Sequence, residues 1–269
     1  SIDGRISRDK SEVLSVDFSD INLWNFSDYL KREFPVGGKL NGNAGIQDFY
    51  GKRLFFSDLN IGNFHFKDQK IGNISLDNQW NLIESVIESD LSITKNNHQS
   101  LVAKGFYNPE NNQLNYNARV NDLALIILET VITKTFSDFK GTASGDLKID
   151  GTPNKILLNG TLAGKNAGLK IDYTNVSYNF TDSVHFKGDT LHFDNIQIED
   201  SEGNPGTFDG TLVHSNFQDM IYNLSLQSPK ILAINTTTQE NDQFFGKVVA
   251  NGNLKITGRG KQVELNGSA

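Results

Sequence analysis

Residues 143–163 read ASGDLKIDGTPNKILLNGTLA, and the end of the chain, residues 250–269, repeats this stretch as ANGNLKITGRGKQVELNGSA. The offset between the two copies is 250 − 143 = 107 residues. The matching pairs are Gly145 and Gly252, Leu147 and Leu254, Lys148 and Lys255, Gly151 and Gly258, Asn159 and Asn266, and Gly160 and Gly267. A repeat at a fixed period is typical of an array whose units bury apolar surface against their neighbours. The repeat therefore predicts similar modules in succession rather than one globular centre.

Each copy has the pattern of a β-hairpin. Leu147 and Ile149 lie two residues apart with Lys148 between them, and Ile156 and Leu158 continue the alternation after the segment Gly-Thr-Pro-Asn-Lys. Alternation at period two puts apolar side chains on one face of a strand and polar side chains on the other. Gly, Pro and Asn in a short connection are typical of turns. We therefore expect two antiparallel strands joined by a turn in each copy.

Composition and charge exclude several classes of function. The 269 residues carry a formal charge of −7, with a pI near 5.2 and no cluster of Lys and Arg. This argues against a nucleic-acid partner and against direct docking on an anionic membrane. The absence of cysteine excludes disulfides and thiolate metal sites. The longest apolar run, residues 123–128, is far shorter than the roughly 20 residues of a membrane-spanning helix. With no signal peptide and no initial methionine, we expect a piece of a longer protein.

Glycines at a G-x-x-x-G spacing mark the starts of modules. The pairs are Gly38 with Gly42 and Gly141 with Gly145, separated by 141 − 38 = 103 residues. Residues 27–33, and an apolar stripe at the helical period from Leu125 to Phe139, predict a short helix just before each pair. We expect these helices to cover an exposed apolar sheet face. Three modules follow: a divergent first module at 1–120, a second at 121–227 and the start of a third at 228–269.

The remaining chain alternates almost continuously between apolar and polar residues, which predicts an all-β fold. A sheet with one apolar face must close, pack on another sheet or be covered. A repetitive array that curls into an elongated β-trough turns that face inward. An inward apolar face of this kind can bind an acyl chain, because burial of each CH₂ group contributes about 0.8 kcal/mol. The residues expected to line this groove are Leu147, Ile149, Ile156, Leu158, Leu169, Ile171, Tyr173, Phe193, Phe208, Leu212, Leu224, Leu226, Leu254 and Ile256.

The last third of the chain resembles the C-terminal region of the TamB-like (translocation and assembly module) family of the AsmA-like superfamily, in its Bacteroidetes-type form. Residues 234–258 match the family pattern at Asn235-Thr236, Asn241, Phe244-Phe245-Gly246 and Gly252, although Phe245 stands where the family commonly has Tyr. The segment IEDSEGNPGTFDGTLVHSNFQDMIYNLSL, residues 198–226, is similar to a second stretch of the same proteins.

This resemblance implies a β-trough, also called a β-taco or half-pipe, within a protein anchored in the inner membrane of a Gram-negative bacterium. It implies a periplasmic location, an outer-membrane barrel of the Omp85 type as partner, and a role in outer-membrane biogenesis. The cargo implied is either phospholipid acyl chains or unfolded outer-membrane barrel proteins. No cofactor is implied.

Other readings of the residues remain open. His185, His192 and His214 lie near Asp189 and Asp194, but their spacing does not predict a metal site, and Asp200 to Asn204 indicates a turn more than a calcium loop. No nucleophile-elbow motif occurs, so we predict no enzyme, although a β-helical glycosidase would show no local signature. The alternatives are a surface adhesin or glycan-binding solenoid, a sealed sandwich core without ligand, and client binding by strand addition to an exposed sheet edge.

Overall fold

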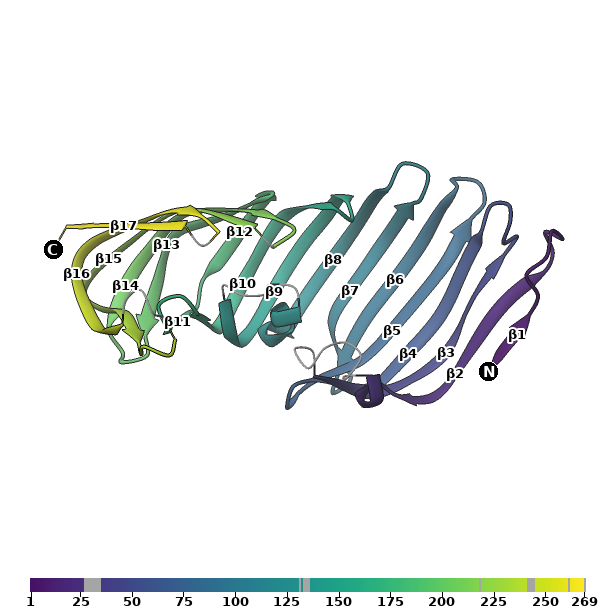
Figure 1. Cartoon of the computed structure of the whole chain (residues 1–269), viewed down its shortest axis with the longest axis horizontal. Coiled ribbons are helices and arrows are strands. Elements are labelled where there is room, and N and C mark those ends of the chain that lie inside the picture. The colour runs from purple at the N-terminus through teal and green to yellow at the C-terminus, as the bar shows by residue number, and fades with distance from the viewer. Residues whose placement is uncertain are drawn as a thin grey trace. The chain divides into compact units, whose positions relative to one another are not determined.

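The computed structural model describes residues 1–26, 35–130, 132, 136–217, 219–240, 245–260 and 262–268. These residues contain 17 β-strands and two short 3₁₀ helices, and the strand pairings recorded among them are antiparallel (Figure 1). The predicted all-β fold is therefore confirmed. The chain divides into two compact units: residues 1–121 with 148–153 form unit 1, and residues 122–147 with 154–269 form unit 2. The three predicted modules stay a prediction.

Unit 1 is an antiparallel meander in which successive strands are neighbours. Its strands are β1 (Ile2–Gly4), β2 (Val13–Asn22), β3 (Val36–Gln47), β4 (Leu54–Phe66), β5 (Gln69–Asn81), β6 (Val86–Lys95), β7 (His98–Asn108) and most of β8 (Gln113–Ala124). From β3 to β8 the strands have similar lengths, between 10 and 13 residues. Alternate turns consequently lie at the same end of the strands, and the side chains form rows across them.

Unit 2 continues the same hairpin connectivity with less regular strands. They are β9 (Phe136–Thr152), β10 (Lys155–Ile171), β11 (Val176–Phe180), β12 (Ser183–Gly188), β13 (Thr190–Asp200), β14 (Pro205–Ser215), β15 (Asp219–Thr236), β16 (Gly246–Arg259) and β17 (Gln262–Ser268). Both β11 and β12 pair with β10 on one side and β13 on the other, so together they act as one interrupted strand. The strand β15, at 18 residues, extends well past the 11-residue β14 (Figure 1).

The two repeated sequences form hairpins, as their alternation predicts. The first is β9 with β10, and the second is β16 with β17, whose pairing runs from Asn253 with Ser268 to Arg259 with Gln262. Glycine is required in the G-x-x-x-G frame because the backbone there has positive φ. Gly145 has φ 151°, and a Cβ at that position would lie 2.1 Å from the Thr161 carbonyl oxygen of β10. Only glycine tolerates both conditions, so the frame marks close strand approach.

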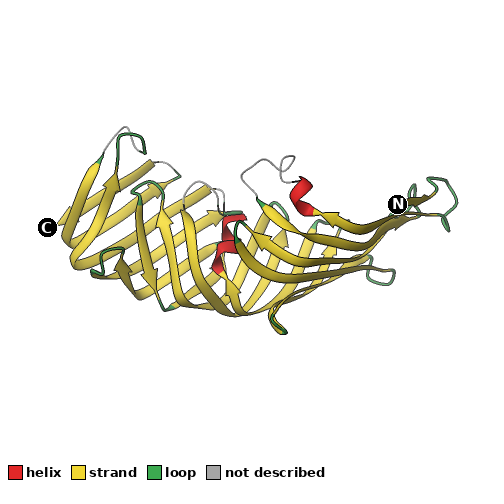
Figure 2. Ribbon diagram, turned by 90° about the horizontal axis from the view of Figure 1, so that it is seen from below, coloured by secondary structure: helices red, strands yellow, loops and turns green. Residues whose placement is uncertain are grey.

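The helices differ from the expectation. The described helices are η1 (Leu23–Phe26) and η2 (Leu125–Thr130), drawn in red in Figure 2. The apolar stripe does not continue as a helix to Phe139, because β9 begins at Phe136 and both phenylalanines are strand residues. Five apolar residues spaced three or four positions apart fit a single long helix, but they also fit a short helix followed by a strand. The spacing alone could not distinguish the two. The helix expected at residues 27–33 lies outside the described residues.

Candidate functional site

The expected groove residues of unit 2 form rows that cross the strands. Phe208 on β14 pairs with Leu226 on β15, and Leu226 pairs with Leu254 on β16. In the adjacent row, Leu224 pairs with Ile256. Residues paired directly across antiparallel strands point to the same face of a sheet. These side chains therefore share one apolar face, as the alternation predicts.

Two buried clusters lie on this face. In the first, Ile196, Ile198, Leu226 and Ile231 pack together; in the second, Leu212, Met220, Tyr222 and Leu224 do. Partly buried side chains surround both clusters, among them Phe193 and Phe208, whose rings meet edge to face at 5.1 Å. The apolar side chains of these clusters are thus already in contact with one another.

The expected lining residues differ in exposure. Leu158, Leu212, Leu224 and Leu226 are buried. Tyr173 is 36% exposed and lies in the turn between β10 and β11, outside the paired strands. Ile149 belongs to unit 1, and its neighbour Lys148 is exposed and forms an ion pair with Asp150 at 3.3 Å. The half-buried residues are Leu147, Ile149, Ile156, Leu169, Ile171, Phe193, Phe208, Leu254 and Ile256.

The second half of β15 closes one end of the unit 2 face. The Leu232 amide donates to Asp200 Oδ2 at the end of β13 (2.6 Å), and the Tyr178 hydroxyl of β11 donates to the Leu232 carbonyl (2.8 Å). Ile231 and Leu232 are 2% and 1% exposed. The register of β15 on β16 shifts between Ser228 and Ile231, where the strand turns. This strand therefore crosses the ends of strands that are not its sheet neighbours.

Asp200 is the polar anchor of that closure. It is 1% exposed and accepts hydrogen bonds from the amides of Glu202, Asn204 and Leu232 and from the Asn204 side chain. Burial alone would raise the pKa of the Asp200 carboxyl, but these hydrogen bonds outweigh it and hold the pKa below its usual range. Burial and the Asp200 charge raise the pKa of Tyr178, which stays a hydrogen-bond donor. The segment Asp200 to Asn204 is thus a turn, as expected.

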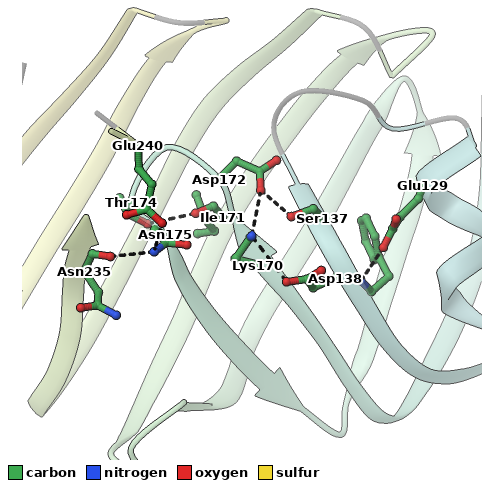
Figure 3. Close-up of polar contacts among 11 residues, drawn as sticks. Glu129, Ser137, Asp138, Lys170, Ile171, Asp172, Thr174, Asn175, Asn235 and Glu240 are labelled. Atoms are coloured by element: carbon green, nitrogen blue, oxygen red, sulfur yellow. Dashed lines mark hydrogen bonds and ion pairs between the residues drawn. The ribbon is translucent and has the colours of Figure 1, made fainter. Parts of the chain in front are cut away.

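Polar contacts continue this closure along the same side of unit 2 (Figure 3). Asn175, in the β10–β11 turn, donates from Nδ2 to the Asn235 carbonyl (2.8 Å) and to Glu240 Oε1 (2.9 Å), and the Asn235 amide donates to the Thr174 carbonyl (2.9 Å). Lys170 lies 3.5 Å from Asp138 and 3.9 Å from Asp172. These contacts connect β9 to β10, and the β10–β11 turn to β15, by polar groups rather than by apolar packing.

Unit 1 has a second apolar face, which is more accessible. Leu59, Leu76 and Leu91 form one row through the pairs Leu59–Leu76 and Leu76–Leu91, and each is half-buried. The row continues to Ala103 and Ala118, which are buried. The lining residues expected from the sequence include only Ile149 from unit 1. The same period-two alternation in residues 54–120 was the signal that would have found this row.

A row of polar residues lies next to these leucines on the same face of unit 1. The pairs Ser57–Asn78 and Asn78–Ser89 define it, and Ser57 and Asn78 are 2% and 9% exposed. Asn78 Nδ2 donates to Ser57 Oγ (2.7 Å), the Ser89 hydroxyl donates to Asn78 Oδ1 (2.6 Å), and the Tyr116 hydroxyl donates to Ser89 Oγ (3.1 Å). Sequence reasoning missed this polar row, because serine and asparagine are also common on the outer face.

Trp80, two residues after Asn78 on β5, carries a polar atom without a partner. Its indole Nε1 is buried and has no hydrogen-bond acceptor, while the side chain as a whole is half-buried. A buried donor without an acceptor costs about 1–3 kcal/mol, so native proteins rarely keep one without a reason. The polar row and this N–H together form the most distinctive chemical feature of the unit 1 face.

The histidines do not gather into a metal site. His185 and His192 are paired residues of β12 and β13, and His185 contacts Thr161 Oγ1 (2.9 Å). His214 is 4% exposed, stacks on Phe217 with ring centroids 3.9 Å apart, and has no hydrogen-bond partner on either ring nitrogen. Burial lowers the pKa of His214 despite the opposing effect of Asp189. Within the described ranges, no group of three or more His, Cys, Asp or Glu side chains is arranged to hold a metal ion.

The comparisons with known proteins give one match. The family model of the TamB C-terminal domain matches residues 194–269, which include β14 to β17 and most of β13. Of the residues that carry the resemblance in the sequence, Asn241 and Phe244 lie outside the described residues, and Phe245 is 63% exposed. No curated protein and no solved structure gives a significant match.

The matched domain associates the chain with the cell envelope and with outer-membrane biogenesis, and it points to a transport or assembly protein rather than an enzyme. Among the residues that the structure describes, no helix is both long and apolar enough to cross a bilayer. The resemblance to the TamB-like family is confirmed over residues 194–269, which match the family model of the TamB C-terminal domain.

Proposed function

We propose that the apolar faces of this protein conduct phospholipid acyl chains through the periplasm, between the inner and the outer membrane. The observation that carries the proposal is the row of half-buried leucines in unit 1, Leu59, Leu76 and Leu91, which share one face of the sheet. Each CH₂ group that such a face removes from water contributes about 0.8 kcal/mol, so an acyl chain of ordinary length binds it without specific contacts.

The TamB domain supports the location and the general role of this groove. By analogy with that family, the complete protein is anchored in the inner membrane and reaches an Omp85-type barrel in the outer membrane. The residues of unit 2 that we expect to take part are the half-buried ones, such as Phe208, Leu254 and Ile256, rather than those of the buried clusters. In a second form of the same proposal, the groove holds unfolded outer-membrane barrel proteins.

Photo-crosslinking in living cells tests the proposal. A photoreactive amino acid replaces Leu59 in unit 1 or Leu254 in unit 2, both half-buried on the apolar faces. The matched controls are Asn60 and Lys255, the exposed next residues of the same strands. Neighbouring strand residues point to opposite faces, so each pair differs in orientation but hardly in position.

We expect phospholipid adducts at Leu59 and Leu254 and none at Asn60 and Lys255. Adducts with a barrel protein at the same two positions would favour the client-holding form. Equal labelling of both faces, or no adduct at any position, would overturn the proposal and favour a sealed structural spacer.

A further inference from the structure

The polar row of unit 1, defined by Ser57, Asn78, Ser89 and Tyr116, forms a chain of hydrogen bonds with one direction. Tyr116 donates to Ser89, Ser89 donates to Asn78, and Asn78 donates to Ser57. A hydroxyl has a single hydrogen, and those of Tyr116 and Ser89 are already used within the chain. The series of hydrogen bonds therefore ends at Ser57. Its hydroxyl oxygen accepts a hydrogen bond from Asn78, and its own hydrogen is left for an acceptor outside the row.

Trp80 adds a second donor beside this end of the row. It lies on the same face of β5 as Asn78, because the two residues are two positions apart, and its Nε1 is buried without an acceptor. Trp80 pairs with Ile87 of β6. Its side chain as a whole is only half-buried, so part of the indole ring lies at the surface of the face. This part of the face thus has two hydrogen-bond donors, the Ser57 hydroxyl and the Trp80 N–H, and neither donates to an acceptor.

The surroundings of these donors select the acceptor. On one side of the polar row lie Leu59, Leu76 and Leu91, and on the other lie Trp80 and Ile87. None of these side chains is charged, so a phosphate placed here would be desolvated without a counter-charge. A neutral carbonyl oxygen accepts hydrogen bonds without that cost. The adjacent leucine row, about 7 Å away along the strands, lies within reach of the chain attached to such a carbonyl.

We infer that Ser57 and Trp80 form a binding site for the ester carbonyl of an acylglycerol lipid whose chain lies on the leucine row. The inference rests on the proposed function and adds to it a fixed point where the lipid is held in register. The face then distinguishes acyl esters from plain hydrocarbons, which an uninterrupted apolar groove would not do.

Tryptophan fluorescence provides the test. The chain contains two tryptophans, so in a Trp24→Phe background Trp80 is the sole tryptophan reporter. The purified chain is titrated with a dibrominated fatty-acid methyl ester and with a dibrominated alkane of the same length, both of which quench a tryptophan that they contact. We expect the ester to quench Trp80 at about a tenfold lower concentration than the alkane, the equivalent of about one hydrogen bond.

Two variants of this background assign the site. Ser57→Ala removes the donor at the end of the row and is expected to abolish most of the preference for the ester. Ser75→Ala makes the same chemical change on the opposite face of β5, where Ser75 pairs with Asn60 and Ser92, and is expected to leave the preference unchanged. Trp80→Phe, followed by displacement of a fluorescent fatty-acyl ester, tests the second donor with the aromatic ring retained. Circular dichroism confirms that each variant keeps its β-sheet.

The outcomes separate this inference from the proposed function. Equal quenching by ester and alkane, or a preference that survives in both Ser57→Ala and Trp80→Phe, would overturn the ester site while leaving an apolar groove intact. If neither compound quenches Trp80, lipid does not reach this face, and the ester site and the groove in unit 1 both fail.

Discussion

Three leucines that form a row in unit 1 are half-buried, whereas three leucines of the buried clusters in unit 2 are almost completely buried. Leu59, Leu76 and Leu91 keep part of their surface accessible, whereas Leu212, Leu224 and Leu226 are 4%, 7% and 5% exposed. The alternation along the strands is the same in both units. For Leu226 the difference comes from β15, which extends past β14 and places Ile231 and Leu232 against β11 and β13. Among the described residues of unit 1, no strand does this. Leu212 and Leu224 are covered instead by Met220 and Tyr222 and by the partly buried Ile132 and Phe136. An equal pattern thus yields leucines that are almost completely buried in one unit and leucines that keep part of their surface accessible in the other.

The largest effect is expected at the anchor of that closing strand. Asp200→Ala leaves the amides of Leu232, Glu202 and Asn204 without their acceptor and is expected to lower the free energy of unfolding by about 3 kcal/mol. Denaturant unfolding measures the loss, and hydrogen exchange locates it in β15. Glu199→Ala, at an exposed position of the same strand, is the control and should stay within about 0.5 kcal/mol of the wild type. Equal losses in both variants would refute the role of Asp200.

Truncation of matched leucines tests the comparison directly. Leu226→Ala, in the buried cluster of unit 2, is expected to cost about 3 kcal/mol because it leaves a cavity that cannot collapse. Leu76→Ala, on the accessible face of unit 1, is expected to cost about 1 kcal/mol because its surroundings already meet solvent. Chemical denaturation of both variants gives the two values. If the two losses agree, the faces of the two units do not differ in the way described.

A charge on the proposed groove should impair function more than the same charge on the outer face. Ile149 is half-buried and its neighbour Lys148 is exposed. Ile149→Asp is expected to reduce lipid capture about tenfold, since a carboxylate in an apolar face repels acyl chains. Lys148→Glu puts the same charge on the outer face, and because it replaces an exposed ion pair with Asp150 by a repulsion that solvent screens, it should behave like the wild type. Photo-crosslinked phospholipid measures the loss of capture, and sensitivity to detergent measures its effect on envelope integrity. The same defect in both variants would contradict an inward-facing groove.

The smallest effect concerns pH. His214 is buried without a hydrogen-bond partner, and its pKa is lowered from 6.5 mainly by burial. The unfolded chain therefore binds a proton more readily than the folded one, and the free energy of unfolding should decrease as the pH falls below about 6.5. His214→Leu should remove this slope. Asp200, whose pKa is also lowered, acts at lower pH, because its contribution is lost only below its ordinary value of 3.8. A slope that persists unchanged in His214→Leu would exclude His214 as its source.

Local pattern was a good guide to the strands and to which residues share a face. The spacing of Leu147 and Leu254 with their neighbours predicted two hairpins that the structure contains. The glycine frame was predicted only to mark module starts, and the structure adds that Gly42 and Gly145 have positive φ. The pattern gave wrong predictions where residues of one structure happen to have the spacing of another. Phe136 and Phe139 continue a helical spacing and yet belong to β9. Tyr173 continues a strand alternation and yet lies in a turn.

The sequence by itself determined the all-β fold, the hairpins and the division of each strand into an apolar and a polar side, because these depend on residues two to ten positions apart. Only the tertiary structure decided how far each apolar face is covered. The bend of β15 brings Leu232 to Asp200, 32 residues away, and the row from Ser57 to Tyr116 joins side chains of four strands. Such contacts depend on strand register and strand length, which determine what lies opposite a residue rather than what lies beside it in the chain.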